Sequence, residues 1–308
     1  MTSTVIADLS AFSQALADLV EKAAVGAVAV KSAPYRVVSG LIVREDLIAV
    51  ANHTLRREDR IPIQTLDGSQ AAGTILGRDP TVDLAFLKVD GGKLKPLTAS
   101  DPASLKAGTL AAVVGLTIDA GPSASLGILG AVGGSRRTWR GGTLEHFFRL
   151  DVNLYPSQSG AAVVDAEGHL IGLATPGLLR HSAVAVPVAT LHRIAEELLK
   201  EGRIRHGYLG VSLHPVAVPA ALRAKLGVAA ESGLILLSVE PESPADKAGW
   251  QIGDILISLD DEPIIDVDEL QTALRGNTVG RSVKASSLRG GELVETQVTV
   301  SERKQKES

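Results

Sequence analysis

Three residue types that together perform nucleophilic catalysis occur in this chain in the order histidine, aspartate, serine. They are His53, Asp83 and Ser159, separated by 30 (83 − 53) and 76 (159 − 83) residues. A serine hydroxyl is a weak nucleophile at neutral pH, so it needs a base to take its proton. The base in turn needs an anion that fixes its tautomer and stabilises its charged form. A histidine between an aspartate and a serine meets both needs, so these residues are candidates for acyl-transfer chemistry.

Each candidate lies where an apolar, strand-like run meets a loop. The runs occupy residues 47–51 before the histidine, 84–89 after the aspartate, and 160–164 and 169–174 after the serine. Taken singly, a histidine, an aspartate or a serine is more often a surface group or a hydrogen-bonded structural group. Polar residues at three strand ends instead fit a site on a rigid β scaffold, and their order is that of chymotrypsin-like double barrels.

The composition limits the class of protein. A length of 308 residues suggests about two domains, and the 45% hydrophobic but only 3% aromatic content predicts aliphatic cores. Because the chain has no cysteine and its histidines lack zinc-ligand spacing, we expect no disulfide, no metal and no cofactor. The net charge of −4 with mixed signs gives no basic face for nucleic acid. No apolar run approaches the length of a membrane span.

Residues 25–202 have the pattern of one mainly β domain. Short apolar runs alternate with Gly, Asp and Pro, and the clearest predicted strands are at 26–30, 37–43, 48–51, 84–89, 110–115 and 170–174. Glycine-rich pieces at 127–130 and 133–134 lack the lysine of a phosphate loop and are predicted to be turns. A closing helix is predicted at 187–202, with Leu191, Ile194, Ala195, Leu198 and Leu199 on one face and Gly202 at its end.

Residues 207–302 read as a second, mixed α and β domain after a short charged linker. The predicted strands are at 209–213, 234–239, 255–259, 282–288 and 295–300. The predicted helices are at 243–248 and 266–275, with Asp266 and Asp268 where an N-cap is wanted. The polar residues 303–308 are predicted to form a disordered tail.

The first 24 residues are predicted to form an amphipathic helix, because Leu9, Phe12, Leu16, Leu19 and Val20 recur at helical spacing. The first five residues hold no Lys or Arg and no apolar segment typical of a secretory signal follows. We therefore expect a cytoplasmic location if Met1 is the native start, and a periplasmic or other extracytoplasmic location if the chain is trimmed.

The chain resembles the HtrA/Deg family of serine proteases, in which a trypsin-like domain precedes a PDZ domain. The resemblance spans roughly residues 25–300 and rests on several segments together. These are Ser39-Gly40-Leu41-Ile42-Val43, residues 66–68, residues 77–85, residues 151–160, Gly207-Tyr208-Leu209-Gly210-Val211 and residues 241–249. It implies an ATP-independent endopeptidase for unfolded or damaged proteins, with a chymotrypsin-like double β-barrel, one PDZ domain and a homo-oligomer, commonly a trimer.

The resemblance also assigns an oxyanion hole to Ser157, Gln158 and Ser159. The family pattern is Gly-Asn-Ser-Gly-Gly-Pro, whereas this chain has Ser157-Gln158-Ser159-Gly160-Ala161-Ala162. A serine resists positive φ where the family's glycine accepts it, so the peptide before the nucleophile could rest flipped. The implied S1 pocket is walled by Asn153, Ala183, Val184 and Ala185, next to Leu173–Thr175 and Ser182. It holds no acidic residue, so we expect a loose preference for modest apolar side chains.

The implied PDZ site binds an extended peptide as an added strand and holds its terminal carboxylate on backbone N–H groups. Its predicted residues are Tyr208, Leu209, Gly210, Val211, Leu270 and Leu274. Their apolar side chains favour a hydrophobic C-terminal residue on the peptide. The two helical leucines could equally belong to the core of the domain.

Two other functions remain open at this point. The first is a catalytically impaired or latent relative that serves as a peptide-binding chaperone or adaptor, and Ser157 is the residue that raises it. The second is a purely structural two-domain scaffold, in which the spacing of His53, Asp83 and Ser159 would be accidental.

Overall fold

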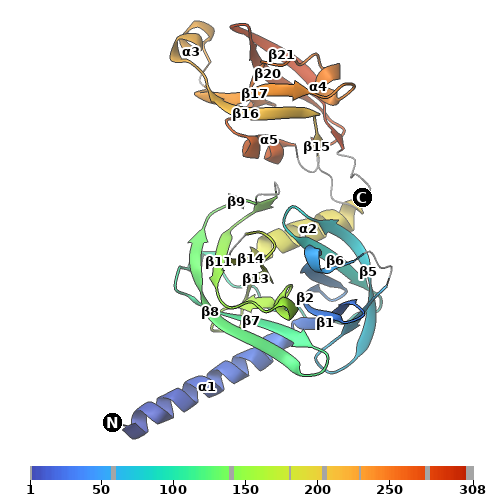
Figure 1. The fold of residues 1–308 in the computed structure, drawn as a ribbon, viewed down its shortest axis with the longest axis vertical. Helices are drawn as coiled ribbons and strands as arrows, with labels where there is room; N and C mark the ends of the chain where they lie inside the picture. Colours follow the sequence, from blue (N-terminus) through green and yellow to red (C-terminus); the bar gives the residue numbers. More distant parts are fainter. Residues whose placement is uncertain are drawn as a thin grey trace. The chain divides into compact units, whose positions relative to one another are not determined.

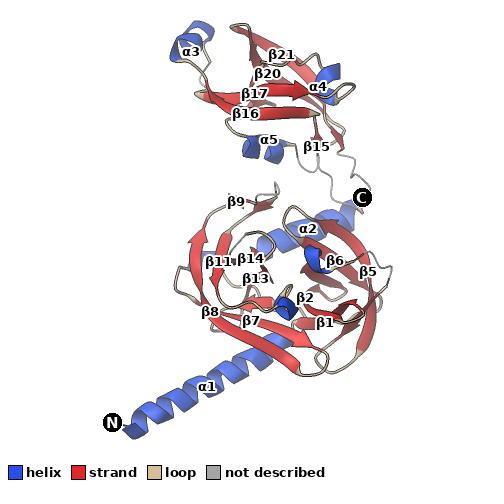
Figure 2. Ribbon diagram, in the orientation of Figure 1, coloured by secondary structure: helices blue, strands red, loops and turns tan. Residues whose placement is uncertain are grey.

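The computed structural model describes residues 2–56, 60–138, 142–179, 182–202, 207–228, 230–274 and 278–302, without the side chains of residues 2–7, 268 and 272. The chain forms two compact units, Met1–Ile204 and Arg205–Ser308. Figure 1 shows the elements of each unit in chain order, and Figure 2 shows that strands predominate in both. The predicted tail at 303–308 and most of the predicted linker lie outside the described residues.

The first unit contains two closed barrels of six strands each, which confirms the predicted double β-barrel. The first barrel has the order β1-β2-β3-β6-β5-β4 and the second the order β11-β14-β13-β12-β7-β8. The strands of the first are β1 (Ala27–Ala33), β2 (Arg36–Arg44), β3 (Leu47–Ala51), β4 (Ile61–Gln64), β5 (Gln70–Asp79) and β6 (Leu84–Val89). Those of the second are β7 (Leu110–Thr117), β8 (Gly121–Gly133), β11 (Phe147–Asp151), β12 (Ala162–Val164), β13 (Leu170–Thr175) and β14 (Ala183–Pro187).

Short elements complete this unit. They are the helices α1 (Thr2–Ala24) and α2 (Val188–Glu201), the strands β9 (Arg136–Arg137) and β10 (Thr143–Leu144), and the 3₁₀ turns η1 (Asn52–Thr54), η2 (Pro102–Ser104) and η3 (Pro156–Gln158). The predicted closing helix is confirmed as α2, which ends at Gly202 with φ 71° and with its N–H bonded to Leu198 O. Leu191, Ile194 and Leu198 are buried in a cluster that includes residues of both barrels.

The cores are aliphatic, as the composition predicted. Side chains alternate along each strand, so one face fills its own barrel and the other faces a neighbouring element. On β1, for example, Val28 and Val30 belong to the first barrel's cluster, whereas Ala27 and Ala29 pack with Leu116 of β7. Among the described residues, the largest side chains that are less than 2% exposed include two aromatic rings, Phe86 and Phe148.

The C-terminal end of the N-terminal helix α1 packs against the barrels. Ala23 and Ala24 are buried and Leu19 and Val20 pack against the core shared by the barrels. Further toward the N-terminus, the apolar residue Leu9 is 63% exposed and Phe12 is 49% exposed. Within the described part of the chain, no helix combines the length and the apolar character that a membrane crossing requires.

The prediction of turns at the glycine-rich pieces was wrong for most of their residues. Gly127, Gly130 and Gly133 lie within the long strand β8. At Gly127 a side chain is excluded by close approach, because a Cβ atom would lie 2.1 Å from Asp151 O of the neighbouring strand. The glycine therefore marks a tight contact between β8 and β11 and not a reversal of the chain.

The second unit is a sheet of strands with short helices. The sheet order is β16-β17-β18-β20-β21, with β19 paired to β18, and β15 pairs with β22. The strands are β15 (Gly207–Tyr208), β16 (Val211–Ala217), β17 (Ser232–Val239), β18 (Ile255–Leu259), β19 (Glu262–Pro263), β20 (Ser282–Arg289), β21 (Glu292–Thr299) and β22 (Ser301–Glu302). The helices are α3 (Ala220–Leu226), α4 (Pro244–Lys247) and α5 (Val267–Ala273). Of these helices, the sequence did not predict α3.

One predicted strand of this unit, residues 209–213, begins later than expected. It starts at Val211, because Gly210 has φ 80° and the carbonyl of Leu209 accepts a hydrogen bond from Ala245 N–H instead of joining a ladder. The predicted N-cap at Asp266 is present, since its Oδ1 accepts the Glu269 N–H at 2.8 Å.

A buried ion pair ties the second unit together. Arg289 donates to both carboxylate oxygens of Asp254, which is only 2% exposed. Burial alone would raise the pKa of Asp254, but the hydrogen bonds from Arg289 and Gln251 outweigh it and hold that pKa below its ordinary value. The carboxylate therefore stays charged and fixes the turn that enters β18.

Candidate active site

The structure brings His53 and Asp83 together at the same end of two paired strands. In the antiparallel pair of β3 and β6, Ala51 lies opposite Leu84, so the residues just beyond each strand end meet. The Asp83 carboxylate accepts the His53 backbone N–H at 2.9 Å through Oδ1 and lies 2.7 Å from His53 Nδ1 through Oδ2. Asp83 is fully buried and has φ 57°, which is rare for a residue other than glycine. This backbone strain is typical of functional sites.

A second element holds the same carboxylate. The hydroxyl of Thr175, at the end of β13 in the second barrel, donates to Asp83 Oδ2. The Gly177 N–H in turn donates to Thr175 Oγ1 at 2.9 Å. Gly177 has room for no side chain, because a Cβ atom would lie 2.3 Å from Asp83 Oδ2. Sequence reasoning missed this role of Thr175, and no local signal reveals it, since 92 residues separate it from Asp83.

Ser159 lies just after the 3₁₀ turn η3 and is 2% exposed. The turn packs closely on β2: Ser39 Oγ donates to Ser157 O at 2.9 Å. The next residue, Gly160, has φ 90°, and a Cβ atom there would lie 2.2 Å from Ser39 O. The glycine is therefore required both by its backbone conformation and by the close approach of β2.

The backbone of the nucleophile turn bonds to itself. Gln158 N–H donates to Tyr155 O at 2.9 Å, and Ser159 N–H donates to Pro156 O at 3.4 Å. The backbone of Ser157 does not have a positive φ. In the described part of the chain, no hydrogen bond joins the His53 ring to the Ser159 hydroxyl. The pairing of His53 with Asp83 is thus complete, while the Ser159 N–H is engaged within its own turn.

The predicted S1 residues fall into different surroundings. Asn153 is exposed beyond the end of β11, whereas Ala183, Val184 and Ala185 are buried on β14. Ala183 and Ala185 belong to the cluster inside the second barrel. Val184 points to the opposite face and belongs to the core shared by both barrels. Strand alternation therefore separates Val184 from the two alanines.

The predicted peptide-binding residues of the second unit also divide. Leu209, Leu270 and Leu274 are at most 6% exposed and form part of the core of this unit. Tyr208 donates its hydroxyl to Glu240, and Val211 opens the strand β16. Among the described residues, the Leu209 and Gly210 N–H groups donate no hydrogen bond. Within that part of the chain, the two N–H groups are therefore unpaired, although both residues are buried.

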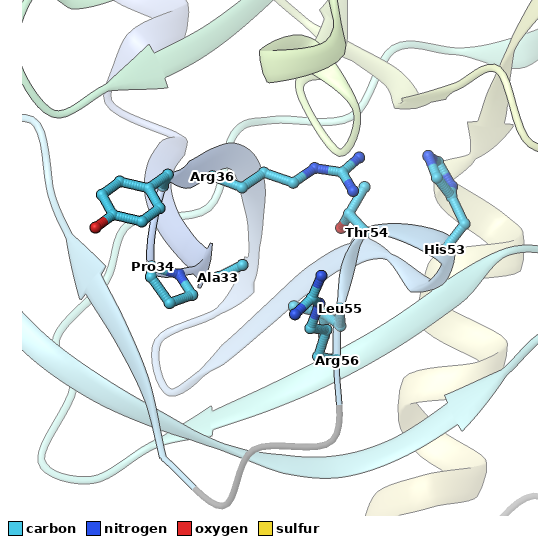
Figure 3. Close-up of a pocket in the computed structure, with 8 residues that line it drawn as sticks. Ala33, Pro34, Arg36, His53, Thr54, Leu55 and Arg56 are labelled. Atoms are coloured by element: carbon cyan, nitrogen blue, oxygen red, sulfur yellow. The ribbon is translucent and has the colours of Figure 1, made fainter.

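A pocket of about 430 Å³ opens beside the His53 ring. Figure 3 shows it between the β1–β2 turn and the segment that contains η1. Its lining residues are Ala33, Pro34, Tyr35, Arg36, His53, Thr54, Leu55 and Arg56. Across the described residues, no three or more His, Asp or Glu side chains are grouped as they would be to hold a metal ion.

Comparison with known proteins agrees with this fold. The family model for the trypsin-like peptidase domain matches residues 38–173, and the model for the PDZ domain matches residues 207–300. The chain thus has the architecture of a chymotrypsin-like serine protease with one PDZ domain.

Similarity to individual proteins indicates which family of serine proteases the chain resembles. The chain is 30% identical over 270 residues to the periplasmic pH-dependent serine endoprotease DegQ of Escherichia coli (strain K12), covering 85% of this chain and 58% of DegQ. It is 28% identical over 268 residues to a probable periplasmic serine endoprotease, DegP-like, of Halomonas elongata, covering 85% of this chain and 56% of the relative. The HtrA-type protease AlgW, solved with a tripeptide, is 26% identical with a TM-score of 0.77, covering 94% of this chain and 97% of AlgW.

These findings show that the chain belongs to the HtrA/Deg family of serine proteases. It spans a little over half the length of the curated relatives it matches.

Proposed function

We propose that this protein is an ATP-independent serine endopeptidase in which Ser159 is the nucleophile, His53 the base and Asp83 the anion that orients it. The observation that carries the proposal is the 2.7 Å contact between His53 Nδ1 and Asp83 Oδ2, next to the end of β3, where Ala51 N would lie 3.3 Å from a Cβ atom on Gly160. With Nδ1 engaged, the other ring nitrogen, Nε2, is left to take the Ser159 proton and later give it to the leaving amine. The relatives are named endoproteases, which favours this function over an impaired adaptor.

The test of this proposal is the Ser159→Ala variant. Removal of the nucleophile should abolish hydrolysis of unfolded casein while the unfolding temperature stays unchanged. Retention of wild-type activity in a preparation free of other proteases would show that Ser159 is not the nucleophile.

We further propose that unfolded or damaged polypeptides are the substrates and that the second unit binds their C-termini. The unpaired N–H groups of Leu209 and Gly210 support this, because a terminal carboxylate could accept from them. Because Leu270 and Leu274 are buried, we expect residues at the edge of β16 to determine which terminal side chain of the peptide is preferred.

A matched pair of peptides tests this step. Titration of the full chain with a peptide ending in an apolar residue should give binding that is weakened by roughly 1.5 to 3 kcal/mol when the same peptide is amidated. Equal affinities would mean that the second unit does not bind C-termini.

Self-association and an extracytoplasmic location complete the proposal. The exposed Leu9 and Phe12 on α1 supply an apolar face that another copy could cover, which supports a homo-oligomer such as a trimer. Light scattering of the wild type and of a Leu9→Ser, Phe12→Ser variant would test it, with a smaller assembly expected for the variant. The DegP-like and DegQ relatives are named as periplasmic proteins, and this supports the extracytoplasmic of the two locations considered above.

A further inference from the structure

The pocket beside His53 is built by the first barrel alone. Residues 33–36 of the β1–β2 turn form one wall and residues 53–56 form the other. Its apolar part consists of Ala33, Pro34 and Leu55. The volume of about 430 Å³ is enough for one or two side chains of a bound polypeptide.

Two arginines give this pocket a positive charge. Arg36 and Arg56 line it from opposite walls, and both residues are exposed. Figure 3 shows the Arg36 side chain extending toward Thr54. Within the described ranges, neither guanidinium makes a hydrogen bond or an ion pair. The neighbouring Arg78 differs, because it donates to Asn52 Oδ1 and to the carbonyl of Arg56 and so has a structural role.

The position of His53 decides which half of a substrate this pocket meets. During amide hydrolysis the acyl half is bonded to Ser159, whereas the leaving amine takes its proton from the histidine. Ser159 and the predicted S1 residues on β14 belong to the second barrel. A pocket that shares His53 but is built from the first barrel therefore lies on the side of the leaving half.

We propose that Arg36 and Arg56 form a subsite for a carboxylate on the leaving half of the substrate, within the first three residues after the scissile bond. The proposal rests on the peptidase function proposed above. A guanidinium presents paired N–H donors that match the two oxygens of a carboxylate, and it is always charged. The carboxylate comes either from an acidic side chain or from a free C-terminus close to the cleavage point.

Binding to the Ser159→Ala variant separates recognition from cleavage. Two amidated peptides that differ only by Glu or Gln at the second residue after the scissile bond serve as probes, with affinity measured by fluorescence anisotropy. We expect the Glu peptide to bind about three- to tenfold more tightly, a modest ratio because both arginines are solvent-exposed. The ratio should shrink at high salt, since exposed charges are screened. A further pair, ending at that residue with a free or an amidated C-terminus, distinguishes the two sources of the carboxylate.

Charge-removing variants identify the residues. Arg36→Gln and Arg56→Gln, each combined with Ser159→Ala, should lower the preference, and the triple variant should bind both peptides equally, at the affinity of the Gln peptide. Lys31→Gln is the matched control, because Lys31 is exposed on the same hairpin but does not line the pocket. It should keep the full preference.

The outcomes are distinct. Equal binding of the Glu and Gln peptides, no binding of the Glu peptide, or a preference that survives loss of both arginines would each overturn the subsite. If the Glu peptide binds with the expected preference but the wild type leaves it intact, Arg36 and Arg56 still form a carboxylate site, whereas the peptidase proposal and the assignment to a leaving half fail. If the wild type cleaves both peptides at equal kcat/KM and the variants bind both equally, the peptidase proposal stands and the subsite fails.

Discussion

The two 3₁₀ turns of the site, η1 with His53 and η3 before Ser159, are held in different ways. At η1 the buried Asp83 carboxylate accepts hydrogen bonds from the His53 backbone and from Thr175, and it contacts the His53 ring. At η3 the contacts are neutral hydrogen bonds: the Ser159 N–H donates to Pro156 O at 3.4 Å, and the Ser39 hydroxyl donates to Ser157 O at 2.9 Å. The His53 turn is therefore held by a charged carboxylate, whereas the turn before Ser159 is held by neutral hydrogen bonds.

This difference has a physical consequence for what each turn can do. A buried carboxylate is costly unless all its partners are in place, so the His53 turn has one favourable arrangement. A backbone N–H such as that of Ser159 can instead donate within the chain or to a substrate oxygen at similar free energy. We therefore expect the His53 turn to be rigid and the Ser159 turn to be the part that changes when a substrate binds.

The largest effect should come from Asp83→Asn. The amide keeps the size of the side chain but no longer stabilises a charged histidine or fixes its tautomer. We expect kcat to fall by about 10⁴-fold, the loss seen for this change at a comparable triad. Peptide hydrolysis measures the fall in kcat, and a thermal melt of the same variant shows whether it remains folded. Activity within tenfold of the wild type would mean that His53 does not depend on Asp83.

The Gly160→Ala variant perturbs the other turn. The new Cβ would lie 2.2 Å from Ser39 O, so the nucleophile must shift. A displacement of about 1 Å costs on the order of 100-fold in rate. Gly121→Ala is the control, because Gly121 also has positive φ, 74°, but has nothing within 4 Å of the added atom. Similar rate losses in both variants would assign the effect to backbone strain and not to the contact with β2.

Thr175→Val removes the bond from the second barrel to Asp83 and keeps the shape of the side chain. Loss of one hydrogen bond to a charged group should lower kcat about thirtyfold, equivalent to about 2 kcal/mol, with little change in KM. Thr175→Ser should restore most of the rate. Thr190→Val is the matched control, since the Thr190 hydroxyl donates to Glu145 away from the site. A rate loss in the control as large as in Thr175→Val would point to general destabilisation.

The smallest expected effect is an increase in activity, caused by Ser157→Gly. Ser157→Gly should let the peptide before the nucleophile rotate and free the Ser159 N–H, which we expect to raise kcat/KM about tenfold. The rate of labelling by a fluorophosphonate should rise in parallel. Ser157→Ala keeps the Cβ atom and should give no gain. Unchanged kinetics for the glycine variant would show that the turn already opens freely with serine.

Much of this protein could be predicted from local sequence. The strand-like runs, the helix α2 with its final Gly202, and the division into a mainly β part and a mixed part all follow from patterns within about fifteen residues. The order of His53, Asp83 and Ser159 likewise gave the candidate triad, because these residues stand at the ends of runs that the pattern already marks. Such signals are readable since backbone periodicity and turn chemistry act over short distances.

Other features were decided only by the packing of segments that are distant in the sequence. Thr175 reaches Asp83, and Ser39 meets Ser157, because the two barrels pack against each other and bring together segments that no local pattern relates. Tertiary packing also placed Gly127 at a close contact between β8 and β11, and it buried Leu270 and Leu274 in the core of the second unit. A residue type shows what chemistry a side chain can perform, but its neighbours follow from register and packing, which depend on the whole chain at once.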